Sequence, residues 1–176
     1  MTEFVVLVDE YDQEVGVQEK ISAHQQAQCH RAFSVFIYRQ QPHIEILLQQ
    51  RQHDKYHCGG LWTNTCCGHP RPGELVQDAA ERRLCEEMGI RSPLSFIDKF
   101  HYIAPFDNGL TENEVDHVFI GTLSSTEFHI NPHEVADFRW VSLPELKKEL
   151  SVNSDHFTPW LMPAFDIACK ALNSLI

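Results

Sequence analysis

Residues 68–90 read GHPRPGELVQDAAERRLCEEMGI and contain the clearest helix signal in the chain. The helix is predicted to begin after Gly73, with Glu74 in its first turn, where the helix dipole favours an anion. Gly89 is predicted to end it after Met88, because glycine readily adopts the left-handed conformation that closes helices.

Strands are predicted on both sides of the helix. Apolar, β-branched runs at 4–9 and around 15–17 predict an opening hairpin. The other predicted strands cover 32–38, 44–50, 96–103, 115–123 and 138–141, and further helices are predicted over 143–150 and from about Trp160 to the C-terminus. The sequence has no internal repeat, low-complexity tract or linker, so one α+β domain over residues 1–176 is the economical fold.

Composition excludes several classes of protein. The chain has 176 residues, 43% hydrophobic and 22% charged, which is typical of one globular domain rather than of a disordered or fibrous chain. Its formal charge of -11 disfavours binding to nucleic acid or an anionic membrane, so an anionic substrate would need local cations. The apolar run at 4–8 is too short for a signal peptide or a membrane span. The six cysteines lack the spacing of a disulfide scaffold, so we expect free thiols in a cytoplasmic protein.

Two short motifs contain histidines that could enter a site. His24 and His30 lie in SAHQQAQCHRAF, although most histidine pairs at this spacing are surface or core residues. In TNTCCGHP, residues 63–70, Cys67 and His69 lie two apart, so on an extended stretch both side chains would face one pocket. From spacing alone, a turn with a buried cysteine explains this second motif about equally well.

A third motif, ENEV, places Glu112 and Glu114 two residues apart at the entry to a predicted strand. Like charges on one side repel unless a cation lies between them, although a solvated acidic loop end is the usual explanation. Together with the three histidines, these carboxylates would suit zinc, manganese or iron. Periodicity does not bring the three motifs together, so their convergence is a hypothesis.

The stretch 68–90 resembles the Nudix box, a loop, helix and loop that binds divalent metal and diphosphate. The matching residues are Gly68, Glu74, Arg82, Leu84, Glu86, Glu87, Gly89 and Ile90. Arg83 departs from the box, because it stands where Nudix hydrolases place a metal-binding glutamate. The resemblance implies a Nudix-like α+β domain with mixed β-sheets packed between helices, and the departure argues against hydrolysis.

A closer resemblance is to the type I isopentenyl-diphosphate isomerases. It rests on TNTCCGHP, ENEV, the histidine pair and FTPW at 157–160, which occur in the right order between about Val8 and Trp160. The gap between His24 and His30 is one residue shorter than in the bacterial pattern. The resemblance implies conversion of isopentenyl diphosphate to dimethylallyl diphosphate, in isoprenoid biosynthesis, by proton addition and removal through a tertiary carbocation-like state.

The same resemblance implies roles for individual residues. Cys67 and Glu114 would transfer the two protons, with Tyr102 hydrogen-bonded near Glu114. A positive charge can lower the pKa of such a thiol. Cys66 would face the opposite side of an extended stretch and is assigned to packing. One zinc or manganese ion would be held by His24, His30, His69, Glu112 and Glu114. A magnesium ion would be held by Glu87, and the substrate would be bound by Lys20, Arg51, Lys55, Arg83 and Trp160.

Simpler interpretations of these residues remain open at this point. Arg83 and Glu87, four residues apart, fit a surface helix pair contributing about 0.3 to 0.5 kcal/mol. Tyr102 fits a strand residue whose hydroxyl is satisfied locally, and Trp160 fits a core tryptophan at a helix start. A Nudix hydrolase of a nucleoside or coenzyme diphosphate would explain the box, and a metal-stabilised binding module would explain the ligands. For the isomerase we expect a small-molecule diphosphate substrate, no nucleic-acid or membrane partner, and a monomer or homodimer.

Overall fold

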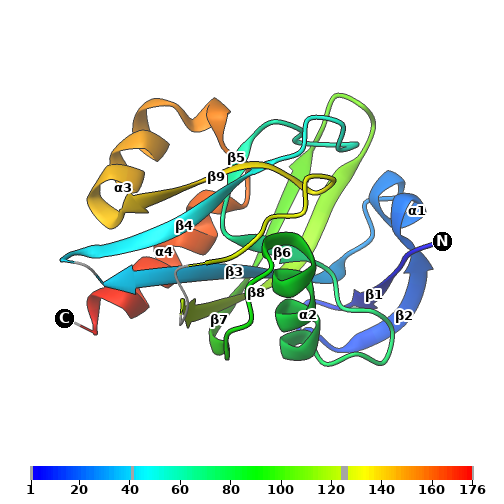
Figure 1. The fold of residues 1–176 in the computed structure, drawn as a ribbon. Helices are drawn as coiled ribbons and strands as arrows, with labels where there is room; N and C mark the ends of the chain where they lie inside the picture. The colour runs from blue at the N-terminus through cyan, green and yellow to red at the C-terminus, as the bar shows by residue number, and fades with distance from the viewer. Residues whose placement is uncertain (1, 41, 124–126, 176) are drawn as a thin grey trace.

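Strand β3 (His30–Gln40) is the centre of the sheet in the computed structural model, which describes residues 2–40, 42–123 and 127–175 (Figure 1). Four strands pair with it: β1 (Phe4–Val8), β4 (Ile44–Arg51), β6 (Cys66–Gly68) and β8 (Thr111–Thr122). The β8 pairing is parallel and places His30 directly opposite Glu114. Two of the candidate motifs therefore meet through the register of the sheet.

The other strands among the described residues complete a nine-stranded mixed sheet. They are β2 (Glu14–Glu19) beside β1, β5 (Trp62–Thr63) and β9 (Val135–Ser142) beside β4, and β7 (Ser95–Pro105) beside β8. The predicted opening hairpin is confirmed, with Val6 opposite Val17. β8 begins four residues earlier than predicted, so ENEV lies inside the strand rather than at its entry.

Helices cover both faces of this sheet (Figure 1). They are α1 (Lys20–Gln25), α2 (Val76–Met88), α3 (Leu143–Val152), the short 3-10 helix η1 (Ser154–His156) and α4 (Leu161–Asn173). The helix predicted at 143–150 is confirmed and extends two residues further, and the predicted C-terminal helix ends at Asn173, with Ile176 outside the described residues. None of the helices in the described part of the chain is long and apolar enough to cross a membrane.

Two hydrophobic cores lie on opposite faces of the sheet, because neighbouring strand residues point in opposite directions. Phe36 packs on the face covered by α3 and α4, together with Phe165 and Leu172. Val35 and Ile37 pack on the other face against α2. This alternation confirms the predicted α+β arrangement, with the sheet packed between helices.

Helix α2 begins later than its sequence suggests. Leu75 is its N-cap residue, so Glu74 lies before the helix rather than in its first turn. The Glu74 carboxylate instead accepts hydrogen bonds from the guanidinium of Arg82, at 2.7 and 2.9 Å, and from the backbone N–H of Arg71. The carboxylate therefore fixes the loop that leads from β6 into the helix.

Helix α1 was not predicted, since only six residues form it and few of them are apolar. Glu19 begins it, because its carboxylate accepts from the backbone N–H groups of Ile21 and Ser22. The helix buries Ala23 and His24. This short polar helix therefore places the candidate ligand His24 in the interior of the protein.

Gly89 ends α2 at a position where a side chain has no room. Its φ is 67°, and a Cβ atom would lie 2.6 Å from the backbone oxygen of His129. We expect Gly89→Ala to lower the free energy of unfolding by roughly 2 to 5 kcal/mol, from backbone strain plus the clash. Gly73→Ala is the control, because Gly73 has a φ of 78° but open space around it. Urea unfolding should show a smaller loss for Gly73→Ala, and equal losses would contradict the role of the His129 contact.

Candidate active site

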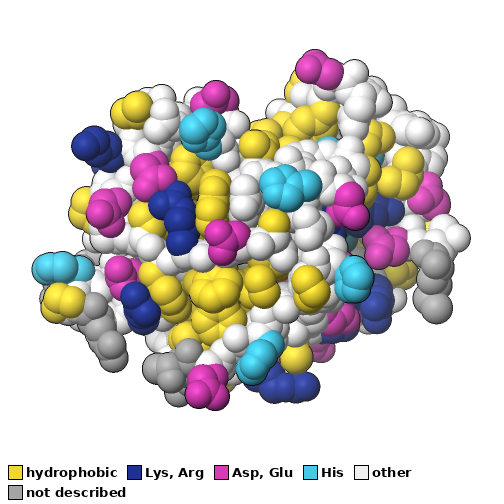
Figure 2. Space-filling model, turned by 45° about the horizontal axis from the view of Figure 1, so that its top comes forward, with side chains coloured by type: hydrophobic (Ala, Val, Ile, Leu, Met, Phe, Trp, Pro, Cys, Tyr) yellow, Lys and Arg dark blue, Asp and Glu magenta, His cyan; other side chains and the backbone are white. Residues whose placement is uncertain are grey.

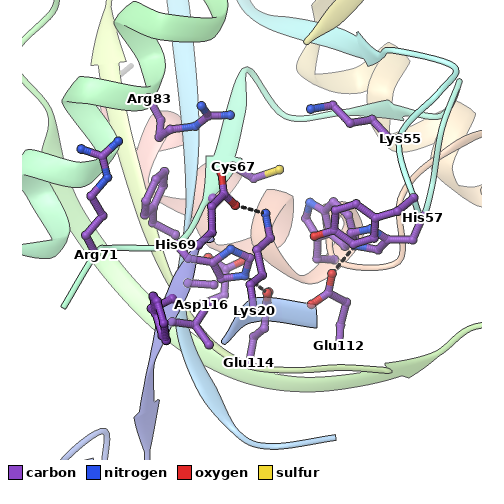
Figure 3. Close-up of a pocket in the computed structure, with 18 of the residues that line it drawn as sticks. Lys20, Lys55, His57, Cys67, His69, Arg71, Arg83, Glu112, Glu114 and Asp116 are labelled. Carbon is purple, nitrogen blue, oxygen red and sulfur yellow. Dashed lines mark hydrogen bonds and ion pairs between the residues drawn. The ribbon is translucent and has the colours of Figure 1, made fainter. Parts of the chain in front are cut away.

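A cavity of about 760 Å³ opens beside the central strands (Figure 3). Its lining includes residues of β1, β3, β4, β6, β7 and β8, of α1 and α2, and of the loop that follows β4. The predicted site residues that line it are Lys20, Arg51, Lys55, Cys67, His69, Arg83, Glu87, Tyr102, Glu112, Glu114 and Trp160. His24 and His30 are fully buried beneath it.

Five predicted ligand side chains meet at the base of the cavity. Each offers one nitrogen or oxygen atom, and these atoms all lie within 4.8 Å of one another; the five are His24, His30, His69, Glu112 and Glu114. They come from α1, from the start of β3, from the segment after β6 and from two positions on one face of β8. The shorter gap between the first two histidines does not prevent them from meeting, since their rings lie 4.7 Å apart.

Hydrogen bonds fix which nitrogen of two of these rings faces the cluster. Nδ1 of His24 donates to the carbonyl of Lys20 at 2.6 Å, and Nδ1 of His30 donates to the carbonyl of Gln28 at 2.8 Å. Because a carbonyl only accepts, Nδ1 carries the proton in each neutral ring, and Nε2 presents a lone pair.

Both Nε2 atoms face carboxylate oxygens. Nε2 of His24 lies 3.0 Å from Oε2 of Glu112, and Nε2 of His30 lies 3.3 Å from Oε1 of Glu114. Both nitrogens and the Glu112 oxygen are buried without a hydrogen-bond partner among the described atoms. Lone pairs facing one another need a cation between them, and a divalent metal ion fits this donor set.

Protonation in the cluster agrees with such a cation. Burial lowers the pKa of His69 to about 4, so this ring is neutral and able to ligate at neutral pH. Burial raises the pKa of Glu114, but the neighbouring imidazoles of His30 and His69 outweigh it and hold the pKa well below its usual value. Burial lowers the pKa of His24, yet the nearby Glu112 carboxylate raises it overall. The Nε2 position of His24 therefore favours a cation, whether a proton or a metal ion.

The comparisons with known proteins agree with this geometry. The NUDIX domain matches residues 29–161. A relative in Aromatoleum aromaticum named isopentenyl-diphosphate Delta-isomerase 2 is 44% identical over 175 residues, covering 98% of this chain and 91% of the relative. The chain belongs to the isopentenyl-diphosphate Delta-isomerase family. A second relative, isopentenyl-diphosphate Delta-isomerase of Photobacterium profundum, is 45% identical over 175 residues and is covered to 97%.

Fold similarity extends further than sequence similarity. The crystal structure of DR0079 from Deinococcus radiodurans superposes with a TM-score of 0.75 at 17% identity, covering 94% of this chain and 99% of that one. At this identity the likeness concerns the fold alone. It agrees with the Nudix fold of the isomerase family.

The isomerase-family chain places its two adjacent cysteines on opposite sides of β6, as predicted. Cys66 is fully buried in the core formed with α2, whereas Cys67 lines the cavity (Figure 3). Nη1 of Arg51 lies 3.8 Å from the sulfur of Cys67. The positive charge of Arg51 lowers the pKa of Cys67, but burial outweighs it and raises the pKa to about 12. The thiol is therefore protonated at neutral pH.

Tyr102 and Trp160 form another wall of the cavity. Tyr102 lies opposite Glu114 in the β7–β8 register, and its hydroxyl donates to Oε2 of Glu114. Its partner is therefore a residue of the cluster rather than a local group. Trp160 is 4% exposed, which agrees with a core tryptophan, but its ring also lines the cavity and lies 5.5 Å from the guanidinium of Arg51.

Cations gather in the cavity although the chain is strongly acidic. Six of the fourteen Lys and Arg residues line it, and the sequence reasoning missed two of them; they are Lys20, Arg51, Lys55, Arg71, Arg82 and Arg83. On the face shown in Figure 2, by contrast, the Lys and Arg side chains are dispersed among acidic ones. The local cations that an anionic substrate requires are therefore present.

Arg83 and Glu87 do not form the surface pair that helix spacing favoured. Glu87 is only 5% exposed, and its carboxylate bonds both the guanidinium of Arg83 and, at 2.8 Å, Nε2 of Gln49. Arg83 also lies 3.4 Å from Glu134. The pair thus faces the cavity, with Glu87 fixed between the helix and β4.

Two buried residues of the site were missed. Asp116 continues the alternation of Glu112 and Glu114 along β8, and this period of two could have indicated it. It accepts a hydrogen bond of 2.7 Å from Ser34, and burial together with Glu114 raises its pKa well above the usual value. His57 lies in the loop after β4 and hydrogen-bonds Glu112. No sequence periodicity indicates His57, because tertiary folding alone brings this loop to β8.

If the cluster binds a divalent metal, the metal should stabilise the fold. We expect Mn²⁺ or Zn²⁺ at about 100 times its Kd to raise the melting temperature of EDTA-treated protein by roughly 5 to 10 °C. Glu112→Gln should remove most of this rise, whereas His43→Ala, which changes an exposed histidine outside the cluster, should retain it. An equal rise in wild type and Glu112→Gln, measured by differential scanning calorimetry, would contradict the assignment.

Proposed function

We propose that this protein converts isopentenyl diphosphate to dimethylallyl diphosphate, a step of isoprenoid biosynthesis. One observation carries the proposal: Cys67 and Glu114 line the same cavity as six cations. The relatives at 44 and 45% identity, which are named isopentenyl-diphosphate Delta-isomerase, support it. The predicted cytoplasmic location and monomeric or homodimeric state stay predictions.

The reaction needs two proton transfers and no net change of atoms. One proton is added to the terminal methylene carbon, and a different proton leaves the carbon next to the diphosphate-bearing one, so the double bond moves. Cys67 on β6 and Glu114 on β8 supply a thiol and a carboxylate to one cavity, and they are the acid–base pair that we propose. Tyr102 holds the second oxygen of Glu114 by its hydroxyl and so orients that carboxylate.

Metal ions complete this proposal. His24, His30, His69, Glu112 and Glu114 would hold one zinc or manganese ion, which offsets the repulsion between the carboxylates and orients Glu114. Glu87 would hold a magnesium ion that neutralises part of the diphosphate charge. The buried position of Glu87 and its bond to Gln49 support this, since they fix the carboxylate at the cavity wall.

The diphosphate would be bound by Lys20, Arg51, Lys55 and Arg83. Lys20 now pairs with Glu3 at 2.8 Å, and Lys55 pairs with Glu134. A diphosphate offers these cations more charge and more acceptor oxygens than a single carboxylate does. We therefore expect it to replace Glu3 and Glu134 as their partner, while Arg51 remains anchored by the carbonyl of His57 at 3.3 Å.

Hydrolysis of a nucleoside or coenzyme diphosphate is the alternative that a Nudix domain allows. Arg83, which occupies the position of a metal-binding glutamate in the hydrolase pattern, pairs with Glu86, Glu87 and Glu134. A cation at this position removes one of the carboxylates with which the hydrolase pattern binds metal. This observation favours isomerisation over hydrolysis.

Cysteine variants test the reaction directly. Proton NMR of protein incubated with isopentenyl diphosphate and Mg²⁺, with Zn²⁺ or Mn²⁺ added, should show dimethylallyl methyl signals and, in heavy water, deuterium uptake. Cys67→Ala should abolish both, because it removes one proton-transfer group. Cys66→Ala should retain most of the turnover, because Cys66 is in the core and outside the cavity lining. Folded, metal-loaded wild type that leaves the substrate unchanged would refute the proposal, as would release of inorganic phosphate.

Trp160 tests the carbocation-like state. Its ring lines the cavity and can face positive charge developing on the substrate, a contact contributing about 2 kcal/mol in a desolvated site. Trp160→Leu should therefore lower kcat roughly 30-fold, with a much smaller change in KM. Trp62→Leu is the control, because Trp62 is not among the residues that line the cavity. An unchanged kcat in Trp160→Leu would remove the ring from the mechanism.

A further inference from the structure

We infer that His57 is a positioning residue for the metal cluster, holding one oxygen of Glu112 so that the other faces the histidines. His57 is 7% exposed and lies in the loop between β4 and β5, far from Glu112 in the sequence. It is not one of the five clustered ligands. The inference rests on the metal site of the proposed function and adds a residue to it.

The two oxygens of Glu112 have different partners. Oε1 bonds Nε2 of His57, whereas Oε2 lies 3.0 Å from Nε2 of His24 and 3.9 Å from Nε2 of His30. Because a carboxylate only accepts, Nε2 of His57 carries the proton in this bond. His57 is therefore a donor to Glu112, and it holds the oxygen other than the one that faces His24 and His30.

The other ring nitrogen of His57, Nδ1, makes no hydrogen bond within the described part of the chain that would explain why a histidine is buried here. Nδ1 is buried without a hydrogen-bond partner among the described atoms. A buried polar atom without a partner destabilises the fold, so a purely structural role would favour an apolar residue here. The bond from Nε2 to Glu112 is the interaction that offsets this cost.

Aromatic neighbours keep the His57 ring in place. The ring stacks on Tyr56 with centroids 4.4 Å apart, and it lies 5.1 Å from Phe106 and 6.1 Å from Trp160. Its backbone carbonyl accepts from Arg51 at 3.3 Å. The ring therefore cannot turn away freely, and it joins the metal cluster to the aromatic wall of the cavity.

A carboxylate ligand held by a second hydrogen bond loses less rotational freedom when the metal binds. Residues that hold metal ligands in this way typically change metal affinity 10- to 100-fold when they are replaced. Removing the donor of His57 should therefore weaken metal binding while leaving all five ligands present. Removing the ring but keeping a donor should have a much smaller effect.

Two complementary variants separate the hydrogen bond from the packing. His57→Phe keeps an aromatic ring without a donor, and His57→Gln keeps an N–H group at a similar reach without the ring. We expect Mn²⁺ affinity, measured by competition with a chromophoric chelator, to fall 10- to 100-fold in His57→Phe and less than about threefold in His57→Gln. His53→Ala, an exposed histidine in the same loop, should bind Mn²⁺ as wild type does.

The readouts distinguish this inference from the proposed function. The electron paramagnetic resonance spectrum of bound Mn²⁺ should change in His57→Phe and be restored in His57→Gln, which a general loss of stability would not produce. Wild-type affinity in His57→Phe, or equal losses in both variants, would overturn the positioning role. Wild-type protein that binds no Mn²⁺ would instead refute the metal site itself, and isomerisation could still be tested by NMR.

Discussion

The burial of two carboxylates side by side is the constraint on which the site depends. Glu112 and Glu114 project from the same face of β8 and are 2 and 5% exposed. Ionised groups in such surroundings require compensating partners, because water no longer screens them. Three imidazoles converge on them, while His57 and Tyr102 bond one oxygen of each. The β3–β8 register, which puts His30 opposite Glu114, makes this convergence possible.

The same strands separate chemistry from packing. Extended β6 pairs with β3, so Cys66 enters the core beneath α2 while Cys67 enters the cavity. Carboxylates of β8 lie at the base of that cavity, and its cations come from α1, from β4 and the loop after it, and from α2 and the loop before it. The cations that the proposed diphosphate substrate requires are therefore gathered in one cavity, although the chain as a whole carries a formal charge of -11.

Local sequence signals predicted much of the fold. The periodic apolar residues and terminal glycine of α2, the alternating strands and the opening hairpin all reflect interactions between near neighbours, and the structure confirms them. The errors also have local causes. Glu74 precedes the helix, and its carboxylate accepts hydrogen bonds from Arg82, which lies eight residues further along the chain. Helix α1 was not predicted because its six residues have little apolar periodicity. The helix begins at the side chain of Glu19, which caps its first backbone N–H groups.

For the site, the residue types and spacings were sufficient to nominate the three histidines, the two carboxylates and Cys67, since each motif is contiguous and resembles a known pattern. Their meeting in space depends on strand register, which links residues far apart in the chain. The protonation states depend on it as well: burial, which no spacing reports, raises the pKa of Cys67 and lowers that of His69. The role of His57 depends wholly on tertiary structure, because its partner Glu112 lies 55 residues away in the sequence. Composition and motif spacing thus identify the chemical groups, whereas long-range packing decides their distances, their solvation and therefore their charge.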